Sequence, residues 1–194
     1  PMGLADYTLS RKDPAYVGEA KSVRSLRDMA KHRENSPELE RIMEQIHRIP
    51  GMEGVRLDTI TIGSTIYAAK PGDGSAREQA ASCQKVLGAC ANIAKEYATK
   101  RYRSNLINWG MIPFLLQEEP SFSKGDWIYV PDVAEKLSNR LTEIPAYLLG
   151  DSIRNFSLDV QGLSNDEIQV ILKGGLINYY RDVNMQNESD SADN

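Results

Sequence analysis

The chain has 194 residues, which is enough to bury one hydrophobic core and carry an appended segment. Its formal net charge of −4, with 26% charged residues, gives no electrostatic case for binding nucleic acid or an anionic membrane. No apolar run is long enough to span a bilayer, and the first residues lack a basic-then-apolar secretory pattern. We therefore expect a cytoplasmic protein with neither nucleic acid nor membrane as a partner.

The amino-terminal part, residues 1–56, is predicted to be an irregular segment followed by an inserted pair of helices. Residues 1–18 hold prolines and glycines without a sustained apolar period, whereas 19–34 and 37–49 have helical spacing and many charges. The chain opens on proline, so we expect a fragment whose upstream part is missing. Two histidines, His32 and His47, lie in charged helical surroundings, and no metal site is expected.

A strand, a glycine-rich loop and a helix follow. Residues 57–68 are β-branched and partly alternating, which predicts one or two strands, and 77–87 space apolar residues at helical intervals. Between them, residues 71–76 read Pro-Gly-Asp-Gly-Ser-Ala. Glycines allow a tight turn there, and the first helical N–H groups together with Arg77 can hold an anion. The alternative is a glycine-rich turn with a purely geometric role.

Nucleotide-binding motifs fit this loop poorly. A Walker loop needs Gly-Lys-Ser/Thr, but Gly74 is followed by Ser75, Ala76 and Arg77. A dinucleotide fingerprint needs a third glycine where the chain has Arg77. The two cysteines, Cys83 and Cys90, would lie about 10 Å apart if one helix ran through both, so we expect free, buried thiols.

The remaining elements alternate. We expect a helix over 97–110 and a second one after the capping-box sequence Ser-Asn-Asp-Glu at 164–167. The acidic end, 187–194, is predicted to be disordered. Interspersed strands and helices favour an α/β domain. The expected strands are residues 91–94, 112–116, 126–130, 146–149 and 153–160.

Two motifs together resemble the carboxy-terminal swivel domain of the aconitase superfamily. Residues 72–81 read Gly-Asp-Gly-Ser-Ala-Arg-Glu-Gln-Ala-Ala, close to the family's Gly-x-Gly-Ser-Ser-Arg-Glu-His-Ala. Residues 105–113 read Asn-Leu-Ile-Asn-Trp-Gly-Met-Ile-Pro, close to Asn-Leu-x-x-x-Gly-x-Leu-Pro. The thirty residues between Ser75 and Asn105 match the family's separation. The flanking sequence resembles LeuD-like swivel domains of bacterial aconitase-like hydratases.

The resemblance implies an α/β fold with three β/β/α layers, of the aconitase domain 4 type. It assigns residues 57–184 to this swivelling domain and leaves 185–194 as a disordered acidic tail. In the family the domain moves against a larger part that binds a [4Fe-4S] cluster, so we expect no cofactor in this fragment. Amino-terminal cluster-bearing domains of the same protein and a small hydroxy-carboxylate substrate are the expected partners, and the fragment alone is expected to be inactive.

The implied reaction is that of a hydro-lyase, which removes and restores water on hydroxy-di- or tricarboxylates. By similarity Ser75 is the catalytic base, and its alkoxide needs a helix N-terminus, backbone N–H groups and a guanidinium. Arg77, with Gly74 and Ala76, is expected to bind substrate, and a guanidinium can hold a carboxylate by two hydrogen bonds. Asp73 is expected to support the loop.

Two departures from the family pattern bear on the substrate. The family's second serine is Ala76 here, and its histidine is Gln79. Citrate and isocitrate are therefore doubtful substrates, while the base and the arginine are retained. Another substrate-binding arginine of the family falls in the segment expected before Pro1.

Polar residues near the second motif allow two interpretations. Asn105 and Arg103 are predicted to support the loop, although with Arg101 they are also typical of a solvated helix face or a cap. Trp109 and Met111 are predicted to be core residues. An alternative function is a non-catalytic module that senses a carboxylate or phosphate or binds RNA as a regulator, although RNA binding needs a basic surface.

Overall fold

The computed structural model describes residues 2–10, 13–34 and 36–192, of which 186–192 are described by their backbone alone. Helices and strands alternate through most of this length. The helices are α1 (Met2–Ser10), α2 (Pro14–His32), α3 (Pro37–His47), α4 (Arg77–Val86), α5 (Lys100–Asn108), α6 (Val133–Ser138), α7 (Asn165–Leu172) and α8 (Leu176–Ala192), with a 3-10 turn η1 (Leu57–Thr59). The strands are β1 (Ser64–Ala68), β2 (Ala89–Ala94), β3 (Ile112–Leu115), β4 (Trp127–Tyr129), β5 (Glu143–Leu149) and β6 (Arg154–Asp159).

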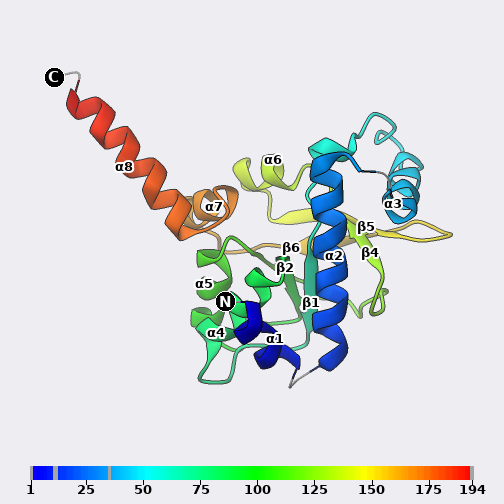
Figure 1. Ribbon diagram of the computed structural model, residues 1–194, viewed down its shortest axis with the longest axis horizontal. Helices are drawn as coiled ribbons and strands as arrows, with labels where there is room; N and C mark the ends of the chain where they lie inside the picture. The colour runs from blue at the N-terminus through cyan, green and yellow to red at the C-terminus, as the bar shows by residue number, and fades with distance from the viewer. Residues whose placement is uncertain (1, 11–12, 35, 193–194) are drawn as a thin grey trace.

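The six strands form one curled sheet in the order β1-β2-β3-β6-β5-β4. β1, β2 and β3 are parallel, because α4 and α5 connect them as crossover helices. β6, β5 and β4 are antiparallel, and they join the first half through a single pair, Leu115 with Asp159. This narrow junction lets the two halves of the sheet run in different directions (Figure 1). The predicted mixed α/β fold class is confirmed.

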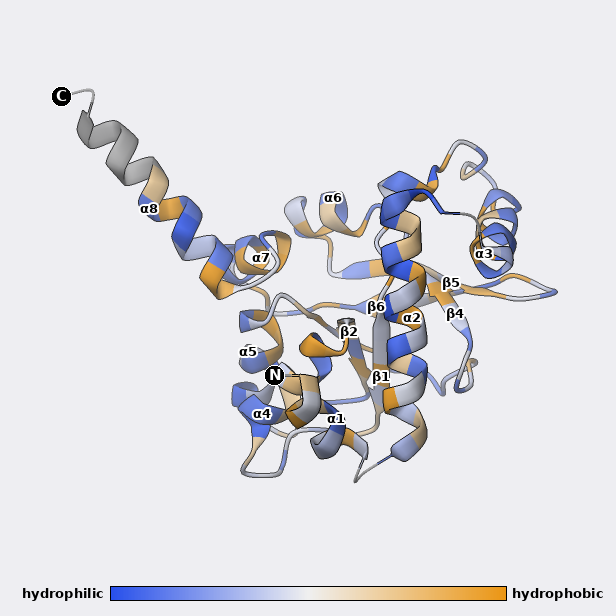
Figure 2. Ribbon diagram, viewed as in Figure 1, coloured by the Kyte–Doolittle hydropathy of each residue, from blue (hydrophilic) through white to orange (hydrophobic). Residues whose placement is uncertain are grey.

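The largest apolar cluster lies where the two halves of the sheet meet. Ile93 and Phe114 contribute from the parallel half, Ile144 and Leu158 from the antiparallel half, and Ile107 from α5. These side chains are at most 3% exposed. Smaller clusters lie beneath the amino-terminal helices, and polar residues cover much of the outward side of α2 (Figure 2). The core therefore joins both halves of the sheet to α5 and α7.

The predicted helical pair is confirmed as α2 and α3, but residues 2–10 and 14–18 are helical and not irregular. α1 occupies Met2–Ser10, and α2 begins at Pro14. Asp13 explains this earlier start, because its carboxylate accepts the backbone N–H groups of Ala15 at 3.0 Å and Tyr16 at 3.3 Å. Proline fits the first position of a helix, so Pro14 starts α2 here instead of breaking it.

Two further differences concern the carboxy-terminal half. α6 was not among the expected elements, and the segment predicted to be disordered continues helix α8 as far as Ala192. Neither glycine nor proline interrupts the sequence after Gly175, so nothing local ends this helix. Residues 193–194 of the predicted tail lie outside the described part. The domain boundaries at 57 and 184 stay a prediction.

Candidate functional site

The glycine-rich loop between β1 and α4 is anchored at its base. The Pro71 carbonyl accepts the Ala98 N–H at 2.9 Å, and the Gly72 carbonyl accepts the Thr99 hydroxyl at 3.1 Å. Gly72 has φ +95°, and a Cβ placed on it would lie 2.4 Å from Cβ of Tyr102. Any other residue at this position would be strained and would clash. The loop base is thus held against the segment that leads into α5.

The tip of the loop is open. Asp73, Gly74, Ser75 and Ala76 are all exposed, and a Cβ at Gly74 would meet nothing within 4 Å. Among the described residues neither the Ser75 hydroxyl nor the Asp73 carboxylate has a hydrogen-bond partner. Ala76 precedes α4 without a side-chain cap. The first N–H groups of α4 therefore face an open region that carries partial positive charge.

Arg77 is the first residue of α4 and is half-buried. Its Nη1 lies 3.4 Å from Oγ1 of Thr99, a long contact for a hydrogen bond. No carboxylate of the described chain forms an ion pair with it. The guanidinium is therefore available to an external anion, beside a helix N-terminus of the same sign.

The next two motif residues point to other helices. The Trp109 indole Nε1 donates to Oε1 of Glu78 at 2.6 Å, which joins the two sequence motifs directly. Gln79 donates from Nε2 to Oγ1 of Thr8 in α1 at 3.2 Å. Gln79, which stands where the resembled motif has histidine, thus contacts α1. Met111 is fully buried, as predicted, while Trp109 is half-buried and packs on the same cluster as Met111.

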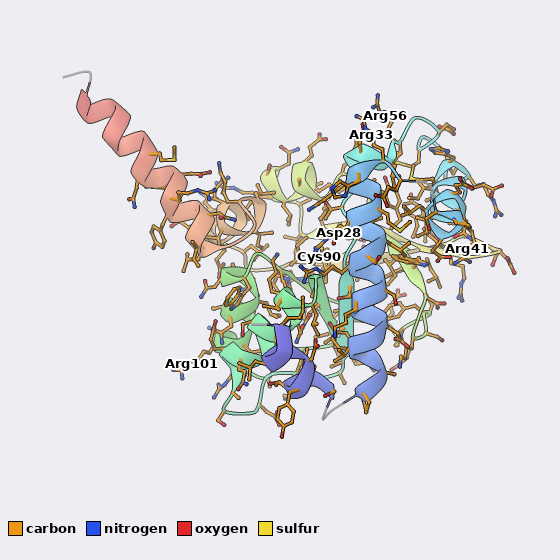
Figure 3. The ribbon with its side chains drawn as sticks, viewed as in Figure 1. Asp28, Arg33, Arg41, Arg56, Cys90 and Arg101 are labelled. Atoms are coloured by element: carbon orange, nitrogen blue, oxygen red, sulfur yellow. The ribbon has the colours of Figure 1, made fainter. Side chains whose placement is uncertain are left out.

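Within the described residues, Arg103 and Asn105, the predicted supporting residues on α5, form no hydrogen bond or ion pair with the loop. Arg103 donates from Nη2 to the Gln161 carbonyl at 3.0 Å, and its Nη1 lies 3.6 Å from the Glu167 carboxylate at the start of α7. Asn105 lies within α5, half-buried, and its side chain has no hydrogen bond inside the described range. Arg101 points away from the body into solvent (Figure 3).

Thr99, and not Arg103 or Asn105, forms hydrogen bonds between α5 and the loop. It is the N-cap of α5, and its Oγ1 accepts the Tyr102 N–H at 3.2 Å while contacting both Gly72 and Arg77. A threonine just before a predicted helix was the available signal. Its link to residues 27 and 22 positions earlier in the chain needed the tertiary structure.

A buried polar cluster lies beneath the loop. The Tyr102 hydroxyl accepts the amide N–H groups of Gln84 at 3.0 Å and Asn92 at 3.1 Å. Burial raises the pKa of Tyr102, and the two amides only partly offset this. The Tyr97 hydroxyl donates to the Phe114 carbonyl at 3.0 Å, and burial raises the pKa of Tyr97 well above its ordinary value. The ring of Tyr102, against which Gly72 packs, is thereby held by α4 and β2.

The described residues contain no group of three or more histidine, cysteine, aspartate or glutamate side chains that could hold a metal ion. Both cysteines are free, Cys83 buried in α4 and Cys90 half-buried in β2. Burial raises the pKa of the Cys90 thiol although the cations of Lys85 and Arg27 oppose it. The chain's own residues therefore do not fit the ligand set of an iron–sulfur cluster, which needs several thiolates at one place.

Two surface depressions lie away from the loop. One, of about 50 Å³, lies between α6 and the start of α7, and a shallower one, of about 430 Å³, lies over β5 and β6. Neither includes a residue of the loop or of α4. None of the helices described here combines the length and apolar character needed to cross a bilayer.

Comparison with known proteins identifies the fold. Residues 60–119 match the family model of the aconitase C-terminal domain, a segment that contains both motifs. Among solved structures, the chain is similar to 3-isopropylmalate dehydratase (leuD) of Methanocaldococcus jannaschii, with TM-score 0.51 and 24% identity over 72% of this chain and 77% of that chain. A search of curated proteins found no match.

The curled α/β sheet and the loop that leads into α4 belong to a fold of the LeuD-like type. The fold is similar to that of this LeuD structure, and the segment that carries both motifs matches the aconitase C-terminal domain model.

Proposed function

We propose that this chain supplies the serine base and the carboxylate-binding arginine of a hydro-lyase acting on hydroxy-di- or tricarboxylates. One observation carries the proposal. Ser75 and Arg77 flank the N-terminus of α4, and among the described residues neither has an anionic partner. A hydroxyl, a guanidinium and free helical N–H groups at one place are what binding a substrate anion and activating a base require.

The proposed chemistry is a dehydration and its reverse. Ser75, as alkoxide, takes the proton from the carbon next to a substrate carboxylate, and the C–H electron pair forms the double bond. The C–O bond of the neighbouring carbon breaks with its electron pair leaving on hydroxide, which takes a proton from solvent to become water. A serine hydroxyl is a very weak acid, so its alkoxide must be stabilised by the α4 N-terminus and by Arg77. The Glu78 carboxylate would oppose that stabilisation, but Trp109 binds it.

The exposure of Ser75 bears on what completes the site. Water would protonate an alkoxide at the open tip, and it weakens each charge interaction there. We propose that the amino-terminal domains of the same protein cover the loop, carry the [4Fe-4S] cluster typical of the superfamily, and act with this chain in the cytoplasm. The described residues lack a ligand set for such a cluster, which fits this division.

We propose a substrate with at least one carboxylate for Arg77 and with less hydroxyl recognition than citrate receives. Ala76 offers a methyl group where the family has a serine hydroxyl, and it is exposed at the open tip. The similar solved structure is named for 3-isopropylmalate, a hydroxy-dicarboxylate. This favours an alkyl-substituted hydroxy-dicarboxylate.

The test is an assay of the full-length protein, anaerobically reconstituted, against a panel of hydroxy acids. Ser75→Ala should lower kcat by about a hundredfold to ten-thousandfold, the range typical of a lost general base. Ser82→Ala is the matched control, because Ser82 lies on α4 and its hydroxyl bonds only the Gln79 carbonyl of its own helix. Equal turnover in the two variants would remove Ser75 from the mechanism.

Arg77→Gln separates catalysis from binding. It should raise KM about tenfold or more, because a charge-assisted hydrogen bond to the substrate is lost. Carboxylate binding to the wild-type protein without turnover of any panel member would instead support the sensing module. Retention of RNA at low salt would support the RNA-binding alternative.

A further inference from the structure

We propose that Thr99 is the positioning residue for Ser75 and Arg77, an assignment that rests on the proposed function of those two residues. The Thr99 hydroxyl touches three groups: the Gly72 carbonyl at 3.1 Å, the Tyr102 N–H at 3.2 Å and Nη1 of Arg77 at 3.4 Å. They belong to the loop base, to α5 and to the start of α4.

The direction of each hydrogen bond follows from the chemistry of its partner. A carbonyl can only accept, so the Thr99 proton points at the Gly72 oxygen. A backbone N–H and a guanidinium can only donate, so Tyr102 and Arg77 occupy the two lone pairs of Oγ1. One hydroxyl proton and two lone pairs are therefore all used, and the oxygen has a single satisfied orientation.

This arrangement limits where the loop tip can begin. The bond to the Gly72 carbonyl sets the orientation of the peptide between Gly72 and Asp73, and Ser75 follows two residues later. The ring of Tyr102 blocks the other side of Gly72. Thr99 is also the N-cap of α5, and its hydroxyl accepts a backbone N–H of that helix. The helix therefore fixes the position of the Thr99 hydroxyl.

The contact with Arg77 is of a different kind. At 3.4 Å it is near the weak end of the range, so it orients the guanidinium without holding it firmly. A substrate carboxylate with two short hydrogen bonds would replace it at little cost. Thr99 thus directs Arg77 before the substrate arrives and releases it afterwards.

The test compares three variants. Thr99→Val keeps the shape and removes the hydroxyl, whereas Thr99→Ser keeps all three hydrogen bonds. Ser164→Ala removes the N-cap of α7, a comparable cap at a different helix, and so controls for lost stability alone. The first readout is the backbone amide shifts of residues 72–77 and the Arg77 Nε–H shift of the 194-residue chain, measured by NMR. The second is kcat and KM of the full-length protein.

Thr99→Val should shift the amide signals of residues 72–77 and lower kcat about tenfold to a hundredfold, because a small misplacement of reacting groups is costly. Thr99→Ser should keep the amide signals close to their wild-type positions and kcat within about threefold of wild type. Ser164→Ala should leave both unchanged. Amide shifts at the loop that are the same in Thr99→Val as in Ser164→Ala would overturn the proposal. This NMR result stands even where Ser75→Ala leaves turnover intact, so failure of the proposed function is recognised separately.

Discussion

Trp109 and Glu78 lie 31 residues apart in the sequence, and their side chains meet in a 2.6 Å hydrogen bond from the indole Nε1 to the carboxylate. The bond connects the end of α5 to the first turn of α4. The bond holds the Glu78 carboxylate, a negative charge in the first turn of α4, next to the end of α5. The two motifs that resemble the aconitase family are thus in direct contact.

A double-mutant cycle on this pair should reveal the contact. Trp109→Phe and Glu78→Ala should couple by about 1 kcal/mol in the free energy of unfolding, because each removes one partner of a charge-assisted hydrogen bond. Denaturant unfolding of the four proteins measures this. Trp127→Phe serves as the control, since Trp127 donates at 2.7 Å to Glu38, a different glutamate. Glu78→Ala should combine additively with it, and additivity with Trp109→Phe would contradict the contact.

Gly72→Ala should destabilise the fold by about 2 to 5 kcal/mol. A positive φ costs an alanine about 1 to 2 kcal/mol, and the new Cβ would meet the Tyr102 side chain at 2.4 Å. Gly74→Ala, two residues later, should change stability by no more than about 1 kcal/mol, because nothing lies within 4 Å of its added Cβ. Thermal and denaturant unfolding test the pair. Equal tolerance at both positions would show that the loop base is not held as described.

Stability should fall above about pH 10 through Tyr97. Burial raises the pKa of Tyr97 from the ordinary value of 10.0, so the folded protein keeps this proton after the unfolded chain has lost it. Unfolding is then favoured as pH rises, by about 1.4 kcal/mol per pH unit for each such group. Tyr97→Phe should lower stability near pH 8, because the hydroxyl donates to the Phe114 carbonyl, yet give a shallower alkaline fall.

Tyr180→Phe on α8 provides the matched control, since Tyr180 is exposed. Its alkaline profile should match wild type. Cys90, with its raised pKa, adds to the fall above about pH 9.0, and Lys85, whose pKa burial lowers, opposes it as pH rises toward 10.5. An alkaline fall in Tyr97→Phe as steep as in wild type would exclude Tyr97 as its source.

Acid should weaken the attachment of α3. The Glu38 carboxylate accepts from Arg41 and from the Trp127 indole, both at 2.7 Å, and the Arg41 hydrogen bond chiefly lowers the pKa of Glu38. The unfolded chain therefore binds this proton first, and stability declines as pH falls below about 4.5 through the folded pKa. Glu38→Gln should flatten that decline in denaturant unfolding between pH 6 and 3. Glu40→Gln, on an exposed position of α3, should not.

Local patterns predicted most of the regular structure. Ser164 and Glu167 form the predicted capping box, and α4 and α5 lie where their apolar spacing and Gly110 placed them. The prediction of an irregular segment was wrong for residues 14–18, because Pro14 begins α2, and only the Asp13 carboxylate on two backbone N–H groups makes that start clear. A proline has opposite meanings at the first and the middle position of a helix.

Contacts between residues far apart in the chain could not be predicted from the sequence. Arg103 is a residue type common in binding sites, yet its side chain contacts Gln161 and Glu167. No local sequence pattern indicates these contacts. Thr99 was overlooked because its partners, Gly72 and Arg77, become neighbours only when β1 and β2 pair and carry their loops to the same end of the sheet. Residue type and spacing identified the loop, but tertiary contacts determine what supports it.

The base and the tip of the loop have different roles. Pro71 and Gly72 bind Ala98 and Thr99 by hydrogen bonds, while the exposed residues 73–76 take no part in these bonds. Mutations at the tip should therefore change the free energy of unfolding very little, whereas mutations at the base should lower it. Under the proposed function, changes at Ala76 and its neighbours would alter substrate binding without first requiring compensating stabilising changes elsewhere.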